Sequence, residues 1–172
     1  MKLIYKGKFN GDANSIPHGE HKPGAVKFRE PEDPKKLGLI ANGIAVGIII
    51  AAVAGVILRA GIRNFSIAGV FLSYITLFPH EILHGICFKD EVYLYTNLKD
   101  GMLFVTGPED MSKARFVFMS LLPNIIFGFI PYILFMINPR WKVLGTFGAT
   151  CISMGAGDYL NVFNALTQMP KG

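Results

Sequence analysis

The stretch FSIAGVFLSYITLFPHEILHGICF, Phe65–Phe88, indicates both the fold class and the chemistry of this chain. It contains His80-Glu81-Ile82-Leu83-His84, an HExxH pattern, within an otherwise apolar segment. On a helix, residues four apart share a face, so the two histidines can bind one metal ion together. Glu81 lies beside them, where it can accept a proton from a metal-bound water. Membrane segments rarely contain three such polar groups without a functional reason.

Apolar residues are gathered in four long runs. They make up 51 % of the 172 residues, and the mean hydropathy is +0.40. Each run is long enough to cross a bilayer, for which about 20 residues suffice. A soluble domain of this length would need polar faces on such helices, and these runs lack them. The sequence therefore predicts an all-α polytopic membrane protein with four transmembrane helices, at about 37–60, 64–88, 112–137 and 141–168.

Basic residues are distributed unevenly between the predicted sides of the membrane. The two termini and the middle loop together carry thirteen Lys and Arg residues, and the two short connections carry four. The positive-inside rule then places both termini in the cytoplasm. We expect a polar, basic cytoplasmic segment over 1–36 and a four-helix domain over 37–168. Because residues 1–36 have no apolar core near Met1, no cleavable signal peptide is expected.

A short segment between the second and third runs has β character. Val92–Tyr95 and Met102–Val105 are β-prone, and Asp100-Gly101 between them is a hairpin turn signal. The pattern predicts a cytoplasmic β-hairpin over about 90–107. Its strand edge could hold an extended peptide substrate, or the hairpin could simply connect two helices. Leu3–Phe9 alternates weakly and could form another short strand.

A catalytic zinc ion normally has three protein ligands and one open position. Within the four apolar runs the acidic residues are Glu81 and Asp158, and the motif pair provides the histidines. His80 and Asp158 each lie fifteen residues after the start of their run, on helices predicted to point the same way. Asp158 is therefore the predicted third ligand. The alternative is a carboxylate that reaches water or pairs directly with a histidine.

Other polar residues have less certain roles. Asn161 lies one turn after Asp158 and could orient its carboxylate or bond to another helix, and Asn124 could face the cavity. His18 and His21 form an H-x-x-H pattern among prolines and glycines, which favours a solvated loop over a metal site.

At this point the chain resembles a known class. HEILHG on a membrane helix, followed far downstream by the aspartate of GAGDYLN, is similar to the site-2 protease class of intramembrane metalloproteases. Within that class it most resembles the small bacterial putative zincin peptidase family, an uncharacterised four-helix family, over about 34–166. The resemblance implies His80, His84 and Asp158 as ligands of Zn²⁺ and Glu81 as the catalytic acid and base. The usual context of that aspartate, Asn-Pro-x-x-Pro-x-Asp-Gly, is not found here.

The function expected from the sequence is that of an intramembrane zinc metallopeptidase in the cell membrane. It would hydrolyse peptide bonds in or near membrane segments, with the lipid bilayer and a transmembrane protein substrate as partners. No nucleic acid is expected despite the net charge of +5. A metal-binding membrane protein without protease activity and a small transporter remain alternatives.

Overall fold

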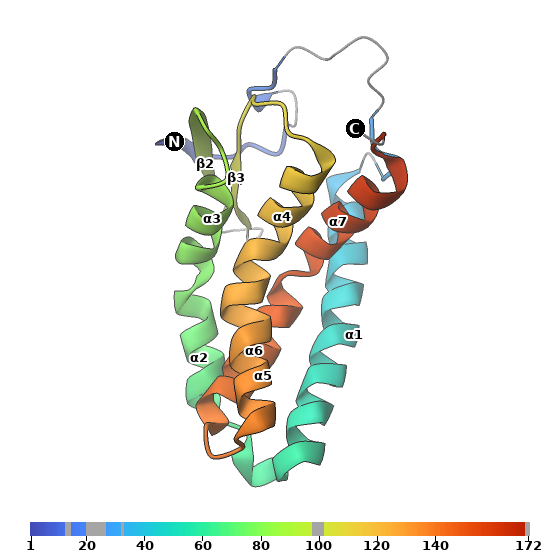
Figure 1. The fold of residues 1–172 in the computed structure, drawn as a ribbon. Coiled ribbons are helices and arrows are strands. Elements are labelled where there is room, and N and C mark those ends of the chain that lie inside the picture. The colour runs from blue at the N-terminus through green and yellow to red at the C-terminus, as the bar shows by residue number, and fades with distance from the viewer. Residues whose placement is uncertain (13–14, 20–26, 32, 98–101, 171–172) are drawn as a thin grey trace.

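The computed structural model describes the chain apart from residues 13–14, 20–26, 32, 98–101 and 171–172. The predicted turn at Asp100-Gly101 and the predicted loop residue His21 lie outside the described residues. Long helices run along one axis as an elongated bundle, and a small sheet lies at the end that also holds both termini (Figure 1). In chain order the elements are β1 (Lys2–Lys8), α1 (Pro34–Ala60), η2 (Ile62–Asn64), α2 (Ile67–Ile75), α3 (Leu77–Gly85), β2 (Glu91–Asn97), β3 (Met102–Thr106), α4 (Lys113–Pro123), the π-helix η4 (Asn124–Phe129), α5 (Ile130–Ile137), α6 (Lys142–Met154) and α7 (Ala156–Gln168).

Helix α1 is a candidate membrane span. Asp33 caps its N-terminus by accepting the backbone N–H of Lys35 at 2.9 Å. Pro34 suits the first position of the helix because it has no N–H that would need an acceptor. Within Lys35–Ala60, only 6 % of the most hydrophobic 18-residue stretch is buried inside the protein. Apolar surface left so exposed on a long helix is stable in hydrocarbon and costly in water.

A second candidate span combines α4, η4 and α5, because these three run continuously from Lys113 to Ile137. Helices α2 and α3 are each too short to cross a membrane, and only together are they long and apolar enough. They are bent by 47° where they meet. By length and composition, the described part of the chain thus holds two membrane-spanning helices, or three if the bent pair is one span. The protein is accordingly a membrane protein.

The prediction of four transmembrane helices was wrong in number, since the described residues hold two candidate spans, or three if the bent pair is one span. The run expected to form one helix over 141–168 is divided at Gly155, whose ψ of 13° interrupts the helix between α6 and α7. Most of α6 is buried inside the bundle. Hydropathy reports that a segment avoids water, but it does not tell whether lipid or protein surrounds that segment.

Small residues bring the other helices close to α6. A Cβ atom on Gly148 would lie 2.6 Å from the backbone nitrogen of Tyr132 and 2.8 Å from the carbonyl oxygen of Gly128. A Cβ atom on Gly145 would lie 2.6 Å from the ring of Phe135, which is fully buried. Such glycines allow backbones to approach where the usual side chains would hold them apart.

The sheet has the order β1-β2-β3. Strands β2 and β3 pair antiparallel, with Tyr93 opposite Thr106 and Asn97 opposite Met102, which confirms the predicted hairpin. Strand β1 confirms the short strand expected near the N-terminus and pairs in parallel with β2, Lys2 opposite Glu91. The all-α expectation is therefore corrected to a mostly helical protein with a three-stranded mixed sheet. The sequence carries no signal for the β1–β2 pairing because some 90 residues separate the partners.

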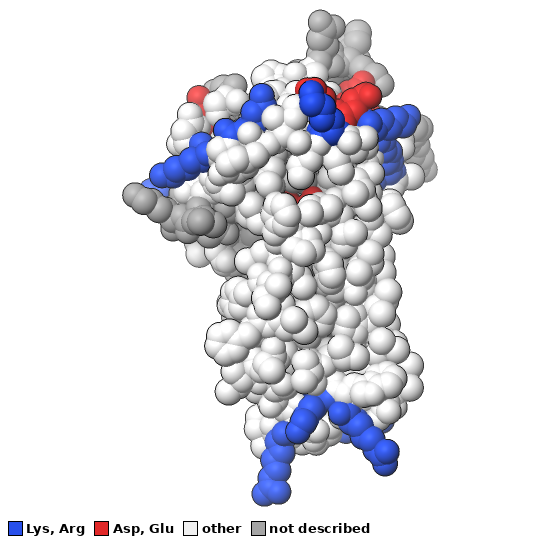
Figure 2. Space-filling model, turned by 90° about the vertical axis from the view of Figure 1, so that its left-hand side faces the viewer, with Lys and Arg blue, Asp and Glu red and all other residues white. Residues whose placement is uncertain are grey.

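Charged side chains divide the surface into zones. On the face shown in Figure 2, Lys and Arg lie at both ends, Asp and Glu lie at the sheet end, and the band between them is uncharged. The sequence has no Asp or Glu from 34 to 80 or from 111 to 157. This arrangement matches a protein that presents an apolar belt to lipid and charged ends to water.

Candidate metal centre

The HExxH motif lies on α3, whose sequence is LFPHEILHG. Pro79 is in the first turn of α3, where backbone N–H groups have no partner within the helix, so the proline is tolerated there. The four-residue spacing turns His80 and His84 to the same side, and their Nε2 atoms lie 3.1 Å apart. His84 is buried, with 7 % of its surface exposed.

Asp158 on α7 meets both histidines. Its Oδ2 lies 3.2 Å from Nε2 of His80, and its Oδ1 lies 3.2 Å from Nε2 of His84. The structure thus brings together His80, His84 and Asp158, which were predicted to meet because His80 and Asp158 lie equally far along their apolar runs. Their role as metal ligands stays a prediction.

The distances among these atoms can be compared with those in a zinc site. Bonds of about 2.0–2.1 Å in a tetrahedron separate neighbouring ligand atoms by about 3.3 Å. The two Nε2 atoms lie 3.1 Å apart, and each lies 3.2 Å from a different oxygen of Asp158, so each separation is close to that value. Two imidazole nitrogens and one carboxylate are also a donor set that suits zinc. The residues therefore fit a zinc ion.

Glu81 completes the cluster on the sheet side. One ligand-type atom from each of His80, Glu81 and His84 can be chosen so that all three lie within 4.8 Å of one another. The Oε2 atom of Glu81 accepts the backbone N–H of Val105 on β3 at 2.9 Å. This bond between α3 and the hairpin fixes the carboxylate beside the histidines, and it has no signature in the sequence.

Helix α4 supports the same cluster from another side. The Nδ1 atom of His84 lies 2.9 Å from the carbonyl oxygen of Met119. Because a carbonyl only accepts, Nδ1 carries the proton in this contact, and Nε2 keeps its lone pair. Asn124 donates from Nδ2 to Oδ2 of Asp158 at 2.7 Å. Asn124 thus makes the contact that the sequence considered for Asn161.

A cavity of about 250 Å³ opens onto these side chains. The motif residues and Asp158 form its floor, Leu103 to Val105 of β3 form one wall, and Asn161 lies on its lining. The cavity therefore joins a candidate metal site to a strand edge. His18 takes no part in this lining: its Nδ1 lies 3.0 Å from the carbonyl oxygen of Ile16 in the N-terminal loop.

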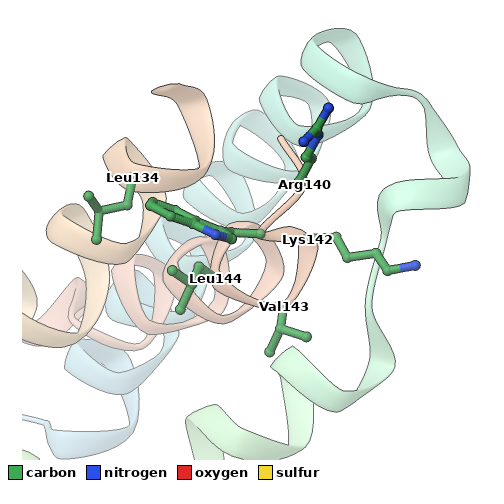
Figure 3. A pocket seen from close by; sticks show the side chains of 6 residues that line it. Leu134, Arg140, Lys142, Val143 and Leu144 are labelled. Atoms are coloured by element: carbon green, nitrogen blue, oxygen red, sulfur yellow. The ribbon is translucent and has the colours of Figure 1, made fainter. Parts of the chain in front are cut away.

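A second cavity, of about 470 Å³, lies at the turn between α5 and α6, away from the motif. Figure 3 shows Arg140 and Lys142 extending away from the apolar side chains of Leu134 and Leu144. The lining contains neither a carboxylate nor a histidine, so this cavity offers no metal ligand of the usual kind.

Comparison with known proteins agrees with this geometry. A model of the family described as "Putative zincin peptidase" matches residues 71–172, which is more than half of the chain and includes the motif and Asp158. No curated protein and no solved structure matches the chain. Zincins take their name from the zinc-binding HExxH motif, and His80, Glu81 and His84 supply that pattern here. The chain belongs to the putative zincin peptidase family.

Proposed function

We propose that this protein is an intramembrane zinc metallopeptidase that hydrolyses peptide bonds in or near membrane segments. His80, His84 and Asp158 are the zinc ligands, and Glu81 is the catalytic acid and base. The observation that carries the proposal is the meeting of the three ligand residues at 3.1–3.2 Å, with Glu81 held beside them. A relationship to site-2 proteases is part of the proposal, supported by an HExxH helix and a later aspartate in an apolar chain.

Zinc, when bound, supplies a Lewis acid that polarises a peptide carbonyl and lowers the pKa of a water molecule towards about 7. Glu81 accepts a proton from the attacking water, whose oxygen forms the new bond to the carbonyl carbon. The carbon–nitrogen bond then breaks, and Glu81 returns the proton to the departing amine. Val105 holds Oε2 of Glu81 in place, which leaves the other carboxylate oxygen for this proton transfer.

The edge of β3 supports a peptide as the substrate. Because the Val105 N–H is directed to Glu81, it does not point towards β2, and alternation gives the backbone of Leu103 the same outward direction. Strand β1 covers the other edge of β2, so β3 is the edge strand among the described residues and lines the cavity. An extended peptide could pair with that edge beside Glu81. The substrate-holding use of the hairpin is thus preferred to the plain connector.

The topology proposed from the sequence is retained. Both termini lie at the sheet end of the bundle, and so does the candidate metal centre (Figure 1). The excess of basic residues in the segments at this end supports a cytoplasmic location for it. Peptide bonds near the cytoplasmic surface of the membrane are therefore the expected sites of cleavage.

The test measures zinc content and proteolysis for the same purified variants in lipid nanodiscs. Near-stoichiometric zinc is expected in the wild type and in Glu81→Gln, and little in His84→Ala or Asp158→Ala. New peptide termini in a membrane-protein mixture are expected with the wild type but not with Glu81→Gln, since that change removes the proton acceptor. His18→Ala, a histidine away from the cavity, should behave as the wild type.

Three results would contradict the proposal. Wild-type protein that folds but binds no zinc would reduce HEILH to a packing motif. Cleavage that persists in Glu81→Gln would remove the mechanism, and zinc binding without any cleavage would favour a metal-binding protein that is not a protease.

A further inference from the structure

The carbonyl that contacts His84 is available because of a proline. In an α-helix, each N–H donates to the carbonyl four residues earlier, and a proline has no N–H to donate. Pro123 lies four residues after Met119, so the Met119 carbonyl lacks its usual partner within α4. That carbonyl accepts Nδ1–H of His84 at 2.9 Å instead. The absence of a backbone donor in one helix thus creates an acceptor for a side chain of another.

The next residue, Asn124, uses its side chain in the same region. Its backbone N–H donates to Leu121 rather than to Ser120, and the Ser120 carbonyl accepts Nδ2 of the Asn124 side chain at 3.2 Å. The other Nδ2 proton goes to Asp158, at 2.7 Å. With 1 % of its surface exposed, Asn124 has little room to adopt another rotamer.

The acceptor side of the Asn124 amide is also engaged. The hydroxyl group of Tyr159 shares its one proton between Oδ1 of Asn124 at 3.3 Å and the carbonyl oxygen of Ile152 at 3.0 Å. A Cβ atom on Gly155 would overlap the same amide, so the break between α6 and α7 leaves space for it. The amide is therefore held by hydrogen bonds with Ser120, Asp158 and Tyr159. Gly155 leaves the space that the amide occupies.

We infer that Pro123 and Asn124 are the positioning residues of the metal centre. Pro123 frees the carbonyl that orients His84 with its Nε2 lone pair towards the cluster, and Asn124 fixes the carboxylate of Asp158. Both lie where α4 meets η4, in a span that contributes no proposed ligand itself. The inference rests on the proposed function, because it assigns these residues to the binding of zinc.

The first test replaces each of the two prolines of the α4–α5 span in turn. Pro123→Ala restores an N–H that can bond to the Met119 carbonyl within the helix and that then competes with His84 for this acceptor. We expect zinc affinity to fall by about 10–100-fold, the usual effect of losing a partner of a ligand. Thermal stability of the metal-free protein should not fall, since an ordinary residue replaces a helix breaker. Pro131→Ala makes the same chemical change within the same span, away from the cluster, and should leave zinc affinity unchanged.

The second test concerns the amide. Asn124→Ala should lower zinc affinity by a similar factor, and Tyr159→Phe by a smaller one. If Tyr159 acts through Asn124, the double variant should bind zinc no more weakly than Asn124→Ala alone. Tyr132→Phe is the matched control, because its hydroxyl donates to the carbonyl of Ala52 at 2.9 Å, far from the motif.

A readout without metal separates this inference from the proposed function. Nitrogen-15 spectra of histidine-labelled, metal-free protein should show His84 protonated at Nδ1, and Pro123→Ala should show a mixture of tautomers. A locked tautomer in a wild type that binds no zinc would overturn the proposed function but support the positioning role of Pro123. Tight zinc binding that survives in both Pro123→Ala and Asn124→Ala, or an equal loss in Pro131→Ala, would overturn the positioning role alone.

Discussion

At the scale of single residues, one half-buried arginine fixes the end of the motif helix. Arg115, at the start of α4, donates from Nε to the carbonyl oxygen of Cys87 at 2.9 Å, and its Nη2 contacts the same oxygen. Its Nη1 pairs with Oε1 of Glu109 at 2.5 Å, and Oε2 of Glu109 accepts the N–H of Lys89 at 2.7 Å. These bonds join the segment after α3 to the start of α4, so the two helices that carry His84 and Met119 share one anchor.

This anchor predicts a pH dependence of stability. The hydrogen bond from Arg115, followed by that from the Lys89 N–H, lowers the pKa of Glu109 from its ordinary value near 4.5. Because the folded-state pKa is lowered, the stabilisation is fully present above the ordinary value and is lost as pH falls through the folded value. We expect the unfolding temperature of the wild type to drop between about pH 5 and about pH 3. The drop should be smaller in Glu109→Gln, and an equal drop in both would contradict the anchor.

At the scale of elements, α6 acts as the central helix against which the candidate spans pack. Its buried face, Gly145 to Ser153, meets α1, α2, α5 and η4, while α1 leaves most of its own surface exposed. Glycines at the contacts replace the large side chains that usually fill a soluble core. The stability of the bundle should therefore be most sensitive to added volume on α6.

Two glycine substitutions of the same kind should have opposite effects. Gly148→Ala places a Cβ atom 2.6 Å from the backbone of Tyr132, so α6 and α5 must separate, at a cost of about 1–3 kcal/mol. Gly47→Ala on α1 has no atom within 4 Å of the added carbon and should stabilise its helix slightly, by up to about 1 kcal/mol. Free energies of unfolding in a mild detergent would measure both. An unfolding free energy of Gly148→Ala equal to that of the wild type would contradict the close packing.

What the sequence could predict at this scale depended on side-chain patterns. The HExxH spacing, the depth of Asp158 and the β-prone runs of the hairpin each have a residue-type signature, and each predicted arrangement is found. The parallel pairing of β1 and the division at Gly155 do not have one. They depend on which backbone surfaces meet in three dimensions. The contact between His84 and the Met119 carbonyl was also not predicted, because every residue has a backbone carbonyl. The sequence feature that marks this one is Pro123.

At the scale of the whole molecule, the uncharged band separates two ends of different charge. In sequence, the two terminal segments and the segment between α3 and α4 carry thirteen basic residues and most of the acidic ones, whereas Arg59, Arg63, Arg140 and Lys142 lie in or beside the two short connections at the other end without acidic neighbours in sequence. The two ends should therefore face opposite compartments.

Reporter fusions would test this topology. A reporter that is active only in the cytoplasm should work when fused after Gly172 and should be silent when inserted beside Arg140, since the positive-inside rule assigns the former end to the cytoplasm. Fusion at the N-terminus should give the same result as fusion at the C-terminus, because β1 and α7 lie at the same end. Equal signals from the C-terminal and Arg140 positions would contradict the topology.

The distance along the chain between His80 and Asp158 has a consequence for biosynthesis. The two residues are 78 positions apart, and a ribosome adds about 5–20 residues per second. Roughly 4–16 seconds therefore pass between the synthesis of His80 and that of Asp158, and Met119 and Asn124 are synthesised during this time. Under the proposed function, the newly made protein stays inactive until α7 has been translated, because α7 carries the carboxylate that joins the two histidines.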